Sequence, residues 1–123
     1  MRNVQPQELL NPIPVAMTRR EKLLRLAELV RSHPGPLALY HGLEYIHIDD
    51  LYRFIICNDI SAFGLAARDE VFRQQGMQEN ATIGNVKQFL ELNQNELHEF
   101  SCDCGGRISN ETMAQRIEGL AAR

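Results

Sequence analysis

The stretch Thr18-Arg-Arg-Glu-Lys-Leu-Leu-Arg-Leu-Ala-Glu-Leu-Val-Arg-Ser32 decides the fold class of this chain. It opens with a capping box, in which the Thr18 hydroxyl accepts a first-turn amide and Glu21 bonds back to the cap amide. Leucines and smaller apolar residues then recur at helical spacing, with charged residues opposite. Pro34 and Pro36 follow, and proline both lacks an amide and restricts the residue before it. We therefore predict an amphipathic helix over residues 18–32.

Shorter helices are predicted along the rest of the chain, each from a capping residue followed by apolar residues three and four apart. The predicted caps are Asp49, Ser61, Asp69, Thr82, Asn93, and either Ser109 or Asn110. The helix capped by Asp49 is predicted to run through Leu51, Phe54 and Ile55. Together these segments predict a mainly α fold, a compact bundle of five or six mostly short helices.

Residues 37–48 are the ambiguous part of the chain. Their aromatic and β-branched residues, with Gly42 in the middle, favour one small β-hairpin, and a helix is the alternative. A hairpin here would make the fold α+β. Residues 1–16 hold three prolines and no sustained period, so we predict an extended N-terminal arm there. Residues 17–123 are then one globular helical domain, a usual domain size.

Composition and charge narrow the function classes. The chain is 44% hydrophobic and 24% charged, as globular domains are, and its net charge is −3. Most acidic residues lie after residue 40, and this argues against a nucleic-acid partner because phosphate binding needs clustered Lys and Arg. No apolar run approaches the roughly 20 residues of a membrane span. Three cysteines do not form a disulfide framework, so we expect a cytoplasmic protein.

His98, Cys102 and Cys104 form the sharpest chemical pattern in the sequence. Imidazole and thiolate are zinc's preferred ligands, and two glycines after Cys104 would let the backbone curl around an ion. A closed structural site needs a fourth ligand, for which His41, His47, Cys57 and Asp103 are the candidates. The same cluster could instead hold a thiol nucleophile. This alternative predicts a metal- or thiol-dependent protein, whereas the leading interpretation needs no cofactor.

Residues 82–100 have the apolar skeleton of a helix-turn-helix motif. Two positions depart from it: Lys87 replaces the small residue at the helix crossing, and Glu91 replaces the turn glycine. Glu96 and Glu99 would also face the phosphates, which repel carboxylates. Nucleic-acid binding through residues 82–100 is therefore a second alternative.

A basic stripe runs along the helix predicted for residues 18–32. We predict that it is a solvated face supported by an ion pair between Glu21 and Arg25, one turn apart. The residues of this stripe are Arg19, Arg20, Lys22, Arg25 and Arg31.

The leading functional interpretation is a binding or regulatory protein that contacts another protein or a second copy of itself. It rests on the lack of a catalytic signature and on a chain size that suits a homodimer. We expect its contact surfaces to be the N-terminal arm and the Leu-rich helix over residues 18–32. An enzymatic activity is not expected.

Overall fold

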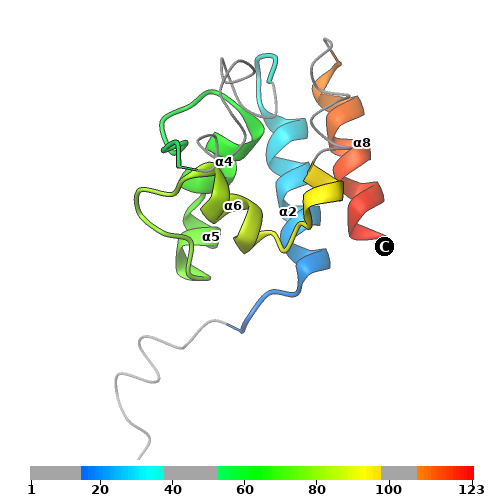
Figure 1. Cartoon of the computed structure of the whole chain (residues 1–123). Coiled ribbons are helices and arrows are strands. Elements are labelled where there is room, and N and C mark those ends of the chain that lie inside the picture. Colours follow the sequence, from blue (N-terminus) through cyan, green and yellow to red (C-terminus); the bar gives the residue numbers. More distant parts are fainter. Residues whose placement is uncertain (1–14, 38–52, 98–107) are drawn as a thin grey trace, which may run out of the picture.

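The computed structural model describes residues 15–37, 53–97 and 108–123. These residues form a compact, mainly helical arrangement, which confirms the predicted fold class. Figure 1 shows the labelled helices, and residues 94–97 are also helical. The labelled helices are α2 (Arg19–Ser32), α4 (Ala62–Arg68), α5 (Glu70–Gln74), α6 (Ile83–Phe89) and α8 (Asn110–Ala121).

The helix α2 begins and packs as its sequence predicts. The Thr18 hydroxyl accepts from the Glu21 amide, and the Glu21 carboxylate accepts from the Thr18 amide at 2.9 Å. Its apolar stripe faces the core, and α8 lies alongside it (Figure 1). The two helices are antiparallel, because Arg31 at the end of α2 meets Glu111 at the start of α8. The buried residues of α2 are Leu23, Leu26, Ala27 and Val30.

The helices α4, α5 and α6 begin at the predicted capping residues Ser61, Asp69 and Thr82, and α8 begins at Ser109, one of the two caps predicted for it. Each cap side chain accepts from an amide two or three residues into its helix, where no backbone acceptor is available. α4 packs against α2, α5 and α6 and buries Phe63. The Phe72 and Phe89 rings join α5 to α6 in a tilted contact with centroids 5.1 Å apart. The apolar residues of all these helices form one core.

Two of the helices end in the same backbone motif. After α5, the amides of Gly76 and Met77 bond back to the carbonyls of Arg73 and Phe72, and Gly76 has φ 106°. After α6, the amides of Glu91 and Leu92 bond back to the carbonyls of Gln88 and Lys87, and Glu91 has φ 58°. Both are Schellman ends, which place one residue in the left-handed region that favours glycine. Glu91 therefore adopts a conformation that costs an L-residue energy.

The helix predicted from Asp49 through Ile55 is wrong where the structure describes it. Residues 53 and 54 form a turn that leads into an isolated antiparallel bridge between Ile55 and Thr82. The Ile56 amide donates to Ala81 and the Ile83 amide donates to Phe54, at 2.9 and 3.0 Å. Pairing with the chain before α6 thus overrides a helical spacing that only three apolar residues supported.

The chain before α2 is held by one amide side chain. Gln75 Oε1 accepts from the Met17 amide at 2.8 Å, and Gln75 Nε2 donates to the Val15 carbonyl at 2.9 Å. Residues 15–18, which include the last two residues of the arm predicted for residues 1–16, are not helical. The rest of that arm, and residues 38–48 of the hairpin predicted for residues 37–48, lie outside the described residues. In the part of the chain that the structure describes, no helix is long and apolar enough to cross a membrane.

Candidate functional site

The metal and thiol cluster predicted from the sequence lies almost wholly outside the described residues. His98, Cys102, Cys104, Asp103, His41 and His47 all belong to the segments that are not described. Cys57 is described, and its thiol is free and buried beside Ile56 in the core. Among residues 15–37, 53–97 and 108–123, no three His, Cys, Asp or Glu side chains are grouped as a metal site would require. The zinc site therefore stays a prediction.

The helix-turn-helix segment is described through Leu97. α6, the turn at Glu91 and the helical residues 94–97 follow one another as the motif requires, and Glu91 takes the left-handed conformation usual for the turn glycine. Asn93, one of the predicted caps, forms a capping box with Glu96, with bonds of 2.8 and 3.0 Å. Glu96 and Leu97 are buried, whereas Gln94 and Asn95 are exposed. Nucleic-acid binding by this segment remains an untested alternative.

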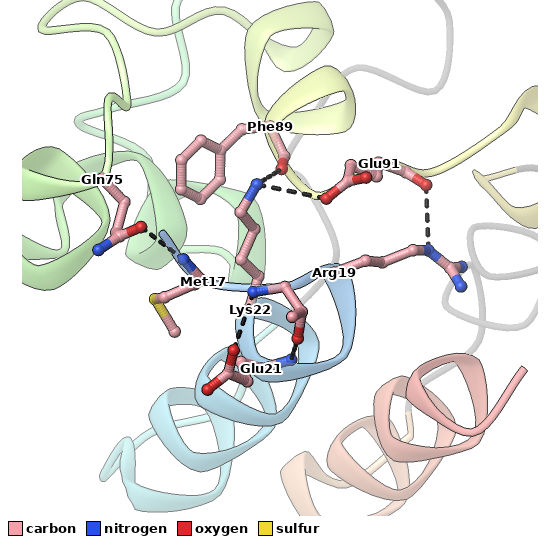
Figure 2. Close-up of polar contacts among 8 residues, drawn as sticks. Met17, Arg19, Glu21, Lys22, Gln75, Phe89 and Glu91 are labelled. Carbon is pink, nitrogen blue, oxygen red and sulfur yellow. Dashed lines mark hydrogen bonds and ion pairs between the residues drawn. The ribbon is translucent and has the colours of Figure 1, made fainter. Parts of the chain in front are cut away.

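The predicted solvated stripe on α2 is wrong for Arg19, Lys22 and Arg25, which are partly buried against other parts of the protein. Arg19 Nε donates to the Glu91 carbonyl at 3.1 Å, and Arg19 Nη2 lies 2.5 Å from the Glu96 carboxylate. Lys22 Nζ donates to the Phe89 carbonyl at 2.9 Å, sits 4.4 Å from the centre of that ring and pairs with Glu91 (Figure 2). Two cations thus meet the C-terminal end of α6, where carbonyls lack helical partners.

The ion pair predicted between Glu21 and Arg25 is also wrong, because each of the two side chains bonds to another residue. Glu21 bonds to the Thr18 amide, which lowers the pKa of its carboxyl group. Arg25 instead makes two bonds to the buried Asp69 carboxylate, at 2.8 and 3.2 Å, and these raise the pKa of the guanidinium. The spacing along one helix favoured Glu21, but Asp69 at the start of α5 offers both carboxylate oxygens.

The far end of α2 is joined to α8 by a surface ion-pair cluster. Arg31 donates to Glu118 at 3.1 and 3.2 Å and to Glu111. Hydrogen bonds from Arg31 lower the pKa of Glu118, and Glu118 and then Glu111 raise the pKa of Arg31. Four of the five cations in the stripe therefore form ion pairs that hold α2 to its neighbours, and Arg20 and Arg31 are exposed at the surface.

An open groove of about 570 Å³ runs beside α6 and the turn after it. Its lining includes hydroxyl, amide and charged groups and the buried Leu92. Thr82 and Asn85 use their side chains to cap α6, so much of the polar lining already has structural partners. The lining residues are Thr82, Gly84, Asn85, Lys87, Gln88, Glu91 and Leu92.

The Leu-rich helix α2, predicted as a contact surface, has its apolar face buried against the core and α8. Within the described ranges, four large apolar side chains are exposed, and three of them lie in residues 54–60. Phe54 is 39% exposed, Ile55 60% and Ile60 58%, and the fourth is Val15. We call residues 54–60 the exposed apolar segment. Apolar exposure concentrated in this way is a feature of interaction sites.

Sequence reasoning missed the exposed apolar segment because it assigned Phe54 and Ile55 to the buried face of a helix. The available signal was Asn58-Asp59, a polar pair that interrupts the apolar residues and places Ile60 beyond it.

Comparisons with known proteins assign no family or function, since no family model, curated protein or solved structure matches this chain.

Proposed function

We propose that this chain is a binding protein whose exposed apolar segment contacts a protein partner. The single observation that carries the proposal is the exposure of Phe54, Ile55 and Ile60 within seven residues. When a partner covers exposed apolar surface, its removal from water contributes about 25 cal/mol per Å² to the free energy of binding. Apolar side chains that lie outside a protein's own core and are grouped on its surface commonly form contacts with a partner.

The partner in this proposal is either another protein or a second copy of the chain, in the cytoplasm. Reducing conditions there would keep the buried Cys57 thiol free, as it is in the structure. We place the partner contact on the exposed apolar segment and not on the basic stripe of α2. In that stripe, Arg19, Lys22 and Arg25 already form ion pairs within the chain.

The test compares three proteins: the natural chain, the double variant Ile55→Lys/Ile60→Lys and the control Val15→Lys. Val15 is 89% exposed and lies outside the segment, so its variant makes the same chemical change elsewhere. Sedimentation at rising concentration measures self-association, and affinity capture from the expressing cells with mass spectrometry identifies other partners. We expect the natural chain and Val15→Lys to behave alike and the double variant to lose the interaction. Equal capture and equal sedimentation by all three proteins would refute the proposal.

A further inference from the structure

The bridge between Ile55 and Thr82 leaves the backbone amide and carbonyl of Ile55 pointing away from Thr82. The two bonds of the bridge are made by the neighbours of the paired residues, from the Ile56 amide to Ala81 and from the Ile83 amide to Phe54. In an antiparallel pair of this type, the amide and carbonyl of the residue itself point to the opposite side. Among the residues that the structure describes, none hydrogen-bonds the amide or carbonyl of Ile55.

Thr82 prevents the bridge from growing on its own side, because it caps α6 and the chain becomes helical from Ile83. An addition to this pair must therefore come on the outer side of Ile55. A backbone edge with an apolar side chain 60% exposed is the combination that peptide-binding sheet edges offer. Main-chain bonds supply affinity in that mode, and the side chains beside the edge supply selectivity.

The size of the exposed apolar segment decides which occupant fits. Its three side chains offer no more than about a few hundred Å² of exposed apolar surface. A standard interface buries about 800 Å² on each partner, so this segment alone is too small for a stable dimer of two copies. A short extended peptide needs less area, because backbone bonds to Ile55 add to the apolar contact.

We propose that Ile55 binds a short extended segment of a partner protein as an added β-strand, with an apolar side chain of the partner beside Ile55 or Ile60. This rests on the proposed function and specifies its partner as an unfolded or terminal segment with at least one apolar residue. The Ile55 amide donates to a partner carbonyl, and the Ile55 carbonyl accepts from a partner amide. Neither bond disturbs the existing bridge, which uses the backbone of Phe54 and Ile56.

The test uses random heptapeptides displayed on phage and selected on the full natural chain. Enriched peptides are synthesised, and their affinities are measured by calorimetry for the natural chain, Ile55→Val and Ile55→Pro. Proline removes the outward amide and leaves the bridge bonds of Phe54 and Ile56 available, whereas valine keeps the amide and most of the apolar surface. We expect Ile55→Pro to lose about tenfold or more in affinity, because a hydrogen bond contributes about that much to binding. Ile55→Val should stay within about threefold, since it loses at most one exposed methylene.

Hydrogen exchange on the natural chain tests the proposal without the Ile55→Pro variant, so the result does not depend on whether that variant folds. The Ile55 amide should exchange at least about tenfold more slowly when the peptide is bound, because a bonded amide must open before it exchanges. The proposal is overturned by any of three results: no enriched peptide, peptides that leave Ile55 exchange unchanged, or a dimer that itself protects the Ile55 amide. If no peptide binds while Ile55→Lys/Ile60→Lys still loses its captured partner, the proposed function stands and only the added strand is refuted.

Discussion

The Arg19 guanidinium lies 2.5 Å from the Glu96 carboxylate, although 77 positions separate the two residues. The same guanidinium donates to the Glu91 carbonyl at 3.1 Å and to the Leu120 carbonyl at 3.4 Å. One side chain in the first turn of α2 thus meets the turn after α6, the helical residues 94–97 and the end of α8. Arg suits this position because its planar group offers five donors in fixed directions.

Replacing Arg19 by Met should destabilise the protein by about 1–3 kcal/mol, the range for hydrogen bonds to charged groups. The buried Glu96 carboxylate would lose its cation, and two carbonyls would lose a donor. Urea unfolding measures the loss. Arg20→Met is the matched control, because Arg20 is the exposed neighbour on the same turn, and it should change stability by no more than about 0.5 kcal/mol. Equal effects of the two variants would contradict the structural role of Arg19.

Asp69 combines two roles that substitutions can separate, since it caps α5 through the Phe72 amide and pairs with Arg25. Asp69→Asn keeps an acceptor for the cap and removes the charge, and it should cost about 1–3 kcal/mol. Asp69→Ala removes both and should cost about 1 kcal/mol more, the value of an N-cap. Thermal unfolding of both variants and of Arg25→Met measures the two contributions. If Asp69→Asn were as stable as the natural chain, the pair with Arg25 would contribute nothing.

The start of each described helix could be predicted from the sequence, and the reason is physical. Capping is local chemistry, because a side-chain acceptor must lie within three residues of the amides it satisfies. The helix starts could therefore be predicted from the capping residues Thr18, Ser61, Asp69 and Thr82. The bridge of Ile55 with Thr82 could not be found in this way, because it joins residues 27 positions apart and no local pattern encodes such a pair.

The candidate site was missed for the same reason. Whether an apolar side chain is buried or exposed depends on the elements that reach it, and Ile55 and Ile60 lie beyond the reach of the core. Likewise the stripe of α2 looked solvated because its partners Asp69, Glu91 and Glu96 are distant in sequence. The spacing of charges within one helix predicts a weak ion pair between Glu21 and Arg25. The bidentate bond from Arg25 to Asp69 on another helix is stronger and forms instead.

The ion pair between Arg31 and Glu118 gives the protein an acid-sensitive contact. Bonds from Arg31 hold the pKa of Glu118 below its ordinary value of 4.5, so this contribution to stability is present above that pH and is lost as the pH falls through the lowered pKa. Arg31→Gln should return the pKa of Glu118 toward 4.5, as measured by NMR titration. The lowered pKa of Glu21 is the internal control, because it arises from Thr18 and should not move. An unchanged Glu118 pKa in Arg31→Gln would refute the assignment.

The left-handed conformation of Glu91 predicts an unusual order of stabilities. Glycine adopts φ 58° without a steric cost, whereas alanine keeps the strain of about 1–2 kcal/mol. Both substitutions remove the pair with Lys22, whose Nζ lies 3.4 Å from the Glu91 carboxylate. Glu91→Gly should therefore be about 1 kcal/mol more stable than Glu91→Ala in urea unfolding. This order is the reverse of that in a helix interior, and equal stabilities would mean that the turn relaxes.

Gly64 and Gly119 both lie inside helices, and alanine should have opposite effects at the two positions. A Cβ atom on Gly64 would lie 2.0 Å from the Asp59 carbonyl oxygen and 2.8 Å from its carbon, in backbone that Arg68 fixes by a bond of 2.6 Å to that oxygen. Gly64→Ala should cost about 3 kcal/mol or more, at the upper end of overpacking effects. A Cβ atom on Gly119 meets nothing within 4 Å, so Gly119→Ala should stabilise the protein by about 0.5–1 kcal/mol. Thermal unfolding of the two variants tests this directly. A tolerated Gly64→Ala would show that α4 can move away from residues 57–59, and the exposed apolar segment would then be less firmly placed than the bonds from Arg68 imply.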